Sequence, residues 1–195
     1  MARYIVGISG ASGSIYGARL LETLRAIPGA IVHLIMSAQA RQTLQIETSM
    51  HPHDLEKLAD FVHDPDDVAA PVSSGSFKTD GMVIVPCSIK TAAAIAYSHN
   101  DNLLVRAADV CLKERRRLVL VVRETPLHLG HLRTLTQLAE IGATILPPIP
   151  AFYTLPKTLD DIIDHTVGKA LDALGVDHSK FPRWQGPPAS APRGR

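Results

Sequence analysis

Short apolar runs alternate along the chain with longer segments in which apolar residues return every three or four positions. Five of the runs are rich in β-branched residues and have the length of strands: 4–8, 31–36, 82–85, 118–122 and 144–146. Because helix-period segments separate them, the pattern predicts βαβ units and five parallel strands. The fold class that follows is α/β, a three-layer αβα protein with an open parallel sheet of the Rossmann-like or flavodoxin-like kind.

The segments between the runs carry apolar stripes of helical spacing. The first stripe begins near Ser14, and its helix should end before Pro28-Gly29. Similar stripes predict helices over 103–111, 129–141 and 159–174, the last being the clearest. In an open sheet with helices on both faces, ligands bind at the carboxyl ends of the strands. A site is therefore expected in the loops that follow the strands.

Two segments lack clear periodicity. Residues 48–80 contain three histidines and the run Ser73-Ser74-Gly75-Ser76, which predicts a short helix followed by a flexible loop. Residues 186–195 are rich in Pro, Gly and Ala and are expected to form a disordered tail. The remaining residues, 1–185, have the size of one domain.

Composition narrows the class of function. Of the 195 residues, 46% are hydrophobic, 20 are basic and 19 are acidic, so the formal net charge is +1. A chain this close to neutral has no long-range field for nucleic acid or an anionic membrane, and a small ligand is the better expectation. Cys87 and Cys111 form no disulfide or metal-ligand pattern, and no apolar run reaches the roughly 18 residues of a membrane span. A cytoplasmic protein is expected.

Two turns that follow strands have the composition of anion-binding loops. Gly7-Ile8-Ser9-Gly10-Ala11-Ser12-Gly13 leads into a helix whose first N–H groups suit a phosphate, although small residues also permit tight packing. Pro86-Cys87-Ser88-Ile89-Lys90-Thr91 is a second such turn, for which capping of the helix by Ser88 and Thr91 is an equally good explanation. Two such turns in one sheet favour a ligand that carries a phosphate.

The end of the second strand indicates the kind of nucleotide. An NAD site usually has Asp or Glu there, but this strand ends at Ser37 and the next acidic residue is Glu47. FMN is therefore favoured over NAD, while Ser37 could instead only cap the next helix. Arg123 follows the fourth strand and offers a planar donor to flavin or phosphate, or forms a surface ion pair with Glu124. Lys113, in a charged helix end, is a further candidate.

Two patterns look like metal sites but have simpler explanations. Asp160-Asp161-Ile162-Ile163-Asp164 has the spacing by which isoprenyl diphosphate enzymes hold magnesium, yet acidic residues also stabilise the first turn of a helix. His128 and His131 stand three apart without a third ligand, so capping or packing is expected. No metal is predicted. Cys87 is expected to be a core residue rather than a nucleophile.

Several blocks of residues together resemble the UbiX family of flavin prenyltransferases. They are Gly10-Ala11-Ser12-Gly13 with Tyr16-Gly17, Pro86-Cys87-Ser88, Arg106-Ala107-Ala108-Asp109-Val110, Leu112-Lys113-Glu114-Arg115-Arg116, Arg123-Glu124-Thr125-Pro126 and Pro150-Ala151-Phe152-Tyr153, in the family's order and spacing. The resemblance covers about 3–184. It implies a homo-oligomer, commonly a dodecamer, with FMN near subunit contacts and an active site shared between chains.

The same resemblance implies a reaction. The dimethylallyl group of dimethylallyl monophosphate would be joined to N5 and C6 of reduced FMN without a metal, and the prenylated FMN would serve a UbiD-type decarboxylase. Whether the pathway is ubiquinone synthesis or aromatic-acid breakdown stays open.

The resemblance also assigns residues to the site. FMN would be bound by Gly10, Ala11, Ser12, Ser37, Ser88, Ile89, Lys90, Thr91 and Arg123. Dimethylallyl phosphate would be bound by Arg106, Lys113, Glu124, Tyr153 and Lys169, where Lys169 stands in place of an arginine of some relatives. The catalytic set would be Ser12, Glu47, Lys113 and Glu124, with Ser12 and Glu47 relaying protons.

Two other functions compete with this one. The first is a flavin-dependent decarboxylase, which would act either on a peptidyl or pantothenoyl cysteine or on an aromatic acid. The cysteine type would need a catalytic histidine and substrate motifs that find no match here. A non-catalytic FMN carrier would not need the cations Lys113 and Lys169 in addition to Arg123.

Overall fold

The five apolar runs form parallel strands of one sheet, as the sequence predicts. They are β1 (Ala2–Ile8), β2 (Ala30–Met36), β4 (Gly81–Cys87), β5 (Arg117–Val122) and β6 (Thr144–Ile145). All residues of β4 are buried, because helices cover both faces of a parallel sheet, and its sequence is therefore apolar throughout. The computed structural model describes residues 1–186, so the expected tail at 186–195 lies outside the described residues except for Gly186.

A sixth strand lies where the sequence analysis expects only a short helix and a loop. The helix is present as α3 (Pro52–Glu56), but β3 (Phe61–His63) follows it and pairs with β2 at the edge of the sheet. A short 3-10 helix, η1 (Pro71–Ser73), comes next. The expectation of a loop throughout was wrong because β3 has only three residues, and two of them, Phe61 and Val62, are exposed. Such an edge strand has no buried apolar run that periodicity could detect.

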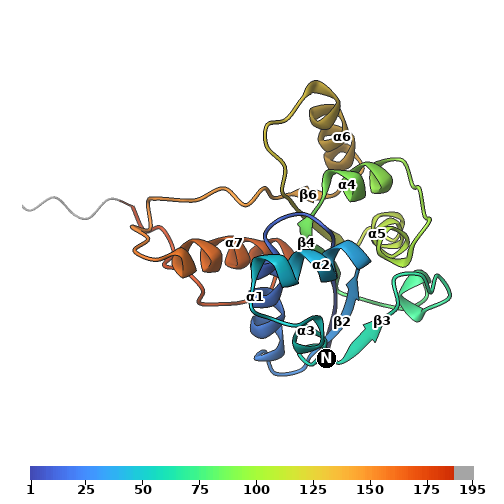
Figure 1. Cartoon of the computed structure of the whole chain (residues 1–195), viewed down its shortest axis with the longest axis horizontal. Coiled ribbons are helices and arrows are strands. Elements are labelled where there is room, and N and C mark those ends of the chain that lie inside the picture. Colours follow the sequence, from blue (N-terminus) through green and yellow to red (C-terminus); the bar gives the residue numbers. More distant parts are fainter. Residues whose placement is uncertain (187–195) are drawn as a thin grey trace, which may run out of the picture.

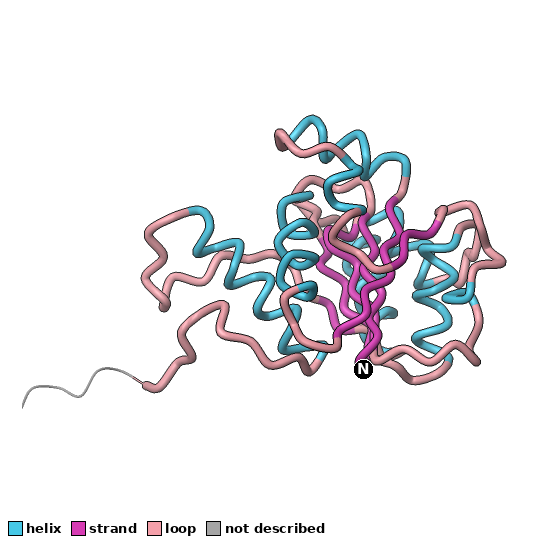
Figure 2. The backbone as a smooth tube through the Cα atoms, turned by 90° about the horizontal axis from the view of Figure 1, so that it is seen from below, coloured by secondary structure: helices cyan, strands magenta, loops and turns pink. Residues whose placement is uncertain are grey.

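Two layers of helices enclose the sheet. One face carries α1 (Ser14–Arg25), α2 (Ala38–Glu47) and α7 (Leu159–Leu174), and the other carries α4 (Ile89–Ala96), α5 (Leu103–Lys113) and α6 (Leu129–Glu140). Figure 1 shows the two groups on opposite sides of the strands, and Figure 2 shows the strands between the helices. Alternate residues of β4 enter the two cores, Val83 on one side and Ile84 on the other. The predicted three-layer αβα fold is confirmed.

The order of strands fixes where a ligand could bind. It is β3-β2-β1-β4-β5-β6, so the direction of winding reverses between β1 and β4. In doubly wound sheets the crevice at such a reversal, outside the carboxyl ends of the strands, is the usual ligand site. Both turns that the sequence marks as anion-binding start there.

Hydrogen bonds of Ser9 hold these two turns together. Its side chain is buried, and its N–H and hydroxyl both donate to the carbonyl oxygen of Pro86, at 3.1 and 3.0 Å. The N–H of Ser88 donates in turn to the hydroxyl of Ser9 at 2.7 Å. The turns after β1 and β4 are therefore fixed side by side before any ligand arrives.

No helix in the described part of the chain has both the length and the apolar surface that crossing a bilayer requires.

The apolar stripe of α7 allows the packing of that helix on the sheet to be tested. Leu171 of α7 is fully buried against the sheet, so Leu171→Ala should lower the free energy of unfolding by about 2–5 kcal/mol through lost contacts and a cavity. Leu159→Ala, in the first turn of the same helix with 71% of the residue exposed, should change it by less than about 0.5 kcal/mol. Urea titration followed by circular dichroism measures both, and equal losses would contradict the assigned packing.

Candidate active site

The N-terminus of α1 binds a carboxylate of the chain itself. Glu47, the last residue of α2, accepts hydrogen bonds from the backbone N–H groups of Gly13 at 2.9 Å and Ser14 at 3.0 Å. Gly13 has a φ of 105°, which glycine adopts without steric cost. The sequence predicts that the first N–H groups of this helix suit a phosphate. That expectation was wrong for Gly13 and Ser14, because a carboxylate already satisfies their N–H groups, and Gly10, Ala11 and Ser12 remain from this turn as candidates for a phosphate.

Glu47 and Ser12 lie together, as the resemblance implies for a proton relay. Burial alone would raise the pKa of Glu47, but hydrogen bonds from the Ser12 side chain and from the N–H groups of Ser14 and Gly13 outweigh it and hold that pKa below its ordinary value. The carboxylate is therefore ionised at neutral pH. Ser12, Glu47 and Arg123 line one cavity of about 450 Å³, which we name the relay cavity.

A second cavity, of about 490 Å³, opens where α2 and α4 begin. We name it the nucleotide cavity. Its lining includes Gly10 and the N-cap residues of the two helices, Ser37 and Ser88. The Ser37 hydroxyl accepts from the N–H of Ala40 at 3.1 Å, and that of Ser88 accepts from the N–H of Thr91 at 3.2 Å. Both serines thus cap their helices, the simpler of the two roles expected for them.

Capping does not remove the attraction of this cavity for an anion. A cap satisfies only one of the first four N–H groups of a helix, and the dipoles of two helices place partial positive charge at the same opening. Lys90 and Thr91 also line it. A Cβ atom added to Gly10 would lie 2.4 Å from the Cβ of Gln39, so only glycine allows the turn after β1 to approach α2 this closely.

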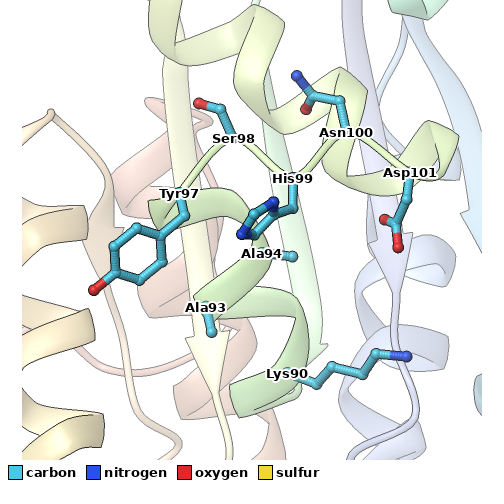
Figure 3. Close-up of a pocket in the computed structure, with 8 residues that line it drawn as sticks. All are labelled: Lys90, Ala93, Ala94, Tyr97, Ser98, His99, Asn100 and Asp101. Atoms are coloured by element: carbon cyan, nitrogen blue, oxygen red, sulfur yellow. The ribbon is translucent and has the colours of Figure 1, made fainter.

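The sequence analysis missed one wall of the nucleotide cavity. Asp101 and Asn102, together with Leu104 and Val105 of α5, line it from the segment that follows α4. These residues follow a helix rather than a strand, so the rule that directs attention to strand ends does not identify them. The wall continues into a shallower hollow over α4 that also includes Lys90 and Asp101, with Tyr97 at its far end (Figure 3).

Arg123 follows β5 at the same edge of the sheet. Its N–H donates to the carbonyl oxygen of Cys87 at 3.0 Å, which connects the turn after β5 to the turn after β4. The expected alternative, an ion pair with Glu124, does not occur among residues 1–186. Glu124 instead accepts a hydrogen bond from the N–H of Thr125 at 3.1 Å. The guanidinium of Arg123 is thus not neutralised by its neighbour.

Tyr153, in the segment before α7, contacts a residue of that helix one turn before Lys169. The Tyr153 hydroxyl lies 3.1 Å from Nε2 of His165, a buried histidine that the sequence analysis did not single out. His165 and Lys169 are four residues apart and share a face of the helix. Burial, and then the positive charge of Lys169, lower the pKa of His165, which keeps its ring neutral at pH 7.

Lys113 does not join the other site residues within one chain. It is on α5 with Arg106, and the first residues of that helix line the nucleotide cavity at the carboxyl edge of the sheet. Lys113 ends this helix just before β5 and forms an ion pair with Glu114, so it lies at the opposite, amino edge. The six residues of β5 span about 20 Å at roughly 3.3 Å per residue, and Lys113 therefore cannot approach Arg123 of its own chain.

The remaining candidates have structural roles. Asp160 and Asp164 bind the guanidinium of Arg19 at 2.6 Å each, and Asp161 caps α7 with Thr158. His128 caps α6 as expected, accepting from two backbone N–H groups, and packs against His131. No group of three or more His, Cys, Asp or Glu side chains that could hold a metal ion gathers within residues 1–186.

The prediction that Cys87 belongs to the core is confirmed. It is buried in the apolar cluster beneath α4 and α5, and burial raises the pKa of its thiol to about 12.

Comparisons with known proteins give close relatives over nearly the whole chain. A family model described as "Flavoprotein" matches residues 1–171. The chain is 60% identical over 188 residues to the flavin prenyltransferase UbiX of Escherichia coli (strain K12), which covers 95% of this chain and 100% of that protein. It is 58% identical over 184 residues to the flavin prenyltransferase UbiX of Thauera aromatica, covering 94% of each.

Solved structures agree with these relatives. A dodecameric FMN-dependent UbiX-like decarboxylase from Escherichia coli O157:H7 superposes with a TM-score of 0.92 at 49% identity, over 94% of this chain and 100% of that one. AnUbiX (PadA1) in complex with FMN and dimethylallyl pyrophosphate gives 0.93 at 49% identity, over 95% and 98%. The FMN-dependent cysteine decarboxylase TvaF, at 15% identity and a TM-score of 0.66 over 90% and 99%, shares the fold alone.

The bond between Glu47 and the start of α1 predicts a pH-dependent stability. Glu47→Gln should lower the free energy of unfolding by about 1 kcal/mol at pH 7, because it removes a charged cap from two N–H groups. Since the folded pKa of Glu47 lies below its ordinary value of 4.5, this contribution is complete above that value and disappears as the pH falls through the lowered pKa. Urea titrations between pH 7 and pH 3 measure the difference.

Glu140→Gln, at an exposed position at the end of α6, serves as the control and should leave the free energy of unfolding unchanged at every pH. A difference between wild type and Glu47→Gln that stays constant down to pH 3 would contradict the role given to this carboxylate.

Proposed function

The chain belongs to the UbiX family of flavin prenyltransferases, and we propose that it joins the dimethylallyl group of dimethylallyl monophosphate to N5 and C6 of reduced FMN. One observation carries the proposal above the others. The nucleotide cavity, with two helix N-termini, and the relay cavity, with Ser12, Glu47 and Arg123, both open at the carboxyl edge of the same sheet. The first suits the phosphate of a nucleotide, and the second offers a base and a cation beside it.

We assign FMN to the nucleotide cavity, with Arg123, which lines the relay cavity, as a further ligand. The N–H groups and hydroxyls of Ser37 and of 88–91 would hold the phosphate, and Gly10 with Ala11 would let the ligand approach the backbone closely. The solved relative AnUbiX, at 49% identity, is in complex with FMN, which supports this assignment.

The residues of the chain would supply the charge and proton transfer that the reaction needs. Reduced FMN, when bound, provides an electron-rich N5 as nucleophile. Negative charge gathers on the leaving phosphate as its bond to the allylic carbon breaks, and Lys169 and Tyr153 are suited to stabilise it. Closure of the new ring at C6 would need a proton on the prenyl double bond and would release the proton of C6, and Ser12 with the ionised Glu47 would carry protons between these positions.

The remaining cations would come from a neighbouring copy. Lys113 lies at the wrong edge of the sheet to serve its own site, so its assigned role requires that another chain supply it. Exposed apolar residues offer surfaces for such contacts: Leu129 and Leu132 on α6, and Ile149, Phe152 and Leu155 on the segment before α7, at 48–79% exposure. That segment extends away from the sheet in Figure 1.

We therefore propose a homo-oligomer, with the dodecamer of the UbiX-like relative from Escherichia coli O157:H7 as the expected form. The prenylated FMN would pass to a UbiD-type decarboxylase. We place the protein in the cytoplasm, in agreement with its two buried free thiols, Cys87 and Cys111.

The competing functions have less support. Solved cysteine decarboxylases share the fold at identities below 25%, whereas the flavin prenyltransferases of Escherichia coli K12 and Thauera aromatica are 60% and 58% identical over nearly the whole chain. A carrier of FMN would leave the pairing of Tyr153 with the His165–Lys169 face without a purpose.

Product mass tests the proposed reaction. Anaerobic incubation with reduced FMN and dimethylallyl monophosphate should convert the extracted flavin to a species heavier by one dimethylallyl group, as mass spectrometry measures it. A parallel reaction with the diphosphate asks whether the longer donor is also accepted. Flavin recovered at the unchanged mass of FMN with both donors would refute the transferase.

Mixed oligomers test whether the site is shared. Lys113→Ala and Lys169→Ala should each lose most activity, because each removes a cation from the donor phosphate. If the two lysines of a site come from different copies, a 1:1 mixture of the two variants can be dissociated and reassembled. About a quarter of the sites should then regain activity, because those sites receive an intact lysine from each copy.

Lys113→Ala mixed with Lys113→Met is the matched control and should recover nothing. A mixture of the Lys113 and Lys169 variants that stays as inactive as this control would show that the two residues do not form one site between copies.

A further inference from the structure

The carboxylate of Asp109 on α5 accepts hydrogen bonds from side chains of two segments, the loop after α4 and α5 itself. The hydroxyl of Ser98 donates to Oδ1 at 2.9 Å, and the amide of Asn100 donates to Oδ2 at 3.0 Å. Nη1 of Arg106, one turn earlier on the same helix, donates to Oδ2 at 3.3 Å. The Asp109 side chain is only 19% exposed. Hydrogen bonds to an ionised acceptor are stronger than neutral ones, so this carboxylate can fix the orientation of all three partners.

The first two bonds fix a strained bend between α4 and α5. Ser98 has a φ of 52°, in the left-handed region that costs a residue other than glycine about 1 kcal/mol. The N–H of His99 closes the bend onto the carbonyl oxygen of Ala94 at 2.8 Å. Figure 3 shows Ser98, His99 and Asn100 in succession along this bend, with Asp101 next in the chain. Asp101 and Asn102 line the nucleotide cavity on the side that follows α4, so the bonds to Asp109 hold that wall in place.

The third bond fixes the guanidinium of Arg106. Its Nε also donates to the carbonyl oxygen of Ser73 at 3.1 Å, so two of its five N–H donors are engaged on different groups. A planar guanidinium held at Nε and Nη1 keeps one orientation, so the direction in which its other N–H groups can donate is fixed. The Arg106 side chain is 34% exposed, which leaves it accessible to an anion.

We propose that Asp109 is a positioning residue that couples the two substrates: it holds the wall of the nucleotide cavity on one side and orients Arg106 toward the allylic phosphate on the other. Asp109 itself touches neither ligand. The part that concerns Arg106 rests on the proposed function, whereas the part that concerns the wall requires only that FMN binds in the nucleotide cavity.

The test replaces the charge of Asp109 at constant size. In Asp109→Asn, an amide meets the donors of Arg106 and Asn100, so the Kd for FMN should rise about fivefold, and the KM for dimethylallyl monophosphate should rise about tenfold. The kcat should stay within about twofold of wild type, since the chemical groups are unchanged. Flavin fluorescence titration and initial rates measure these quantities, with oligomer size and unfolding midpoint checked alongside.

Glu22→Gln is the matched control. Glu22 pairs with Arg19 of α1 at i,i+3, as Asp109 does with Arg106 on α5, and it lines none of the cavities described above. It should leave the Kd and the KM unchanged. Asp109→Glu keeps the charge and should recover part of the FMN affinity.

Two results would overturn the inference. One is an Asp109→Asn protein with the wild-type Kd and KM, and the other is a loss of kcat alone. If Asp109→Asn fails to assemble, Ser98→Ala removes a single bond from the same carboxylate, and an unchanged Kd for FMN in that variant counts equally against the proposal. A wild-type protein that binds FMN but makes no prenylated product refutes the proposed function, while the FMN titration still decides the role of Asp109 at the wall.

Discussion

The hydrogen bonds of Ser9 at the carboxyl ends of β1 and β4 are the constraint on which the site depends. Losing one partner of a buried hydrogen bond costs about 1–3 kcal/mol, so the turns after these strands cannot separate cheaply. The N–H of Arg123 extends the same network to the turn after β5 through the carbonyl oxygen of Cys87. Three strand ends are thus joined by backbone and serine contacts, and the helices that follow β1 and β4 begin from fixed positions.

The helix that follows β1 and the one that follows β4 differ in what their N-termini bind. The start of α1 holds the carboxylate of Glu47, so its first N–H groups are occupied by a side chain of the protein itself. The starts of α2 and α4 have only neutral serine caps, so their dipoles face the nucleotide cavity uncompensated by a carboxylate of their own. In the proposed reaction, the carboxylate at the start of α1 would take part in proton transfer, and the starts of α2 and α4 would bind the phosphate.

Sequence reasoning recovered the parts of this arrangement that follow from periodicity and strand ends. The three-layer fold, the turns at Gly10 and Ser88 and the position of Arg123 all follow from apolar runs and the residues directly after them. β3 was not predicted because an exposed edge strand of three residues has no apolar pattern. The cavity wall at Asp101 and Asn102 was not predicted because it follows a helix rather than a strand.

Two further residues could be understood only from tertiary contacts. Glu47 occupies the start of a helix 34 residues before it in the sequence, and Lys113 faces the edge of the sheet away from its own site. No pattern within a segment encodes a contact between segments or between chains.

The proposed reaction requires two anion sites of different origin, one built by a single chain and the other completed by a second copy. An anaerobic crystal structure of the protein with FMN and dimethylallyl monophosphate examines this directly. We expect the nucleotide's phosphate to lie against Ser37 and 88–91, and the allylic phosphate to lie between Tyr153 and Lys169 of one copy and Lys113 of another. An allylic phosphate bound entirely by one chain, with Lys113 of every copy in bulk solvent, would contradict it.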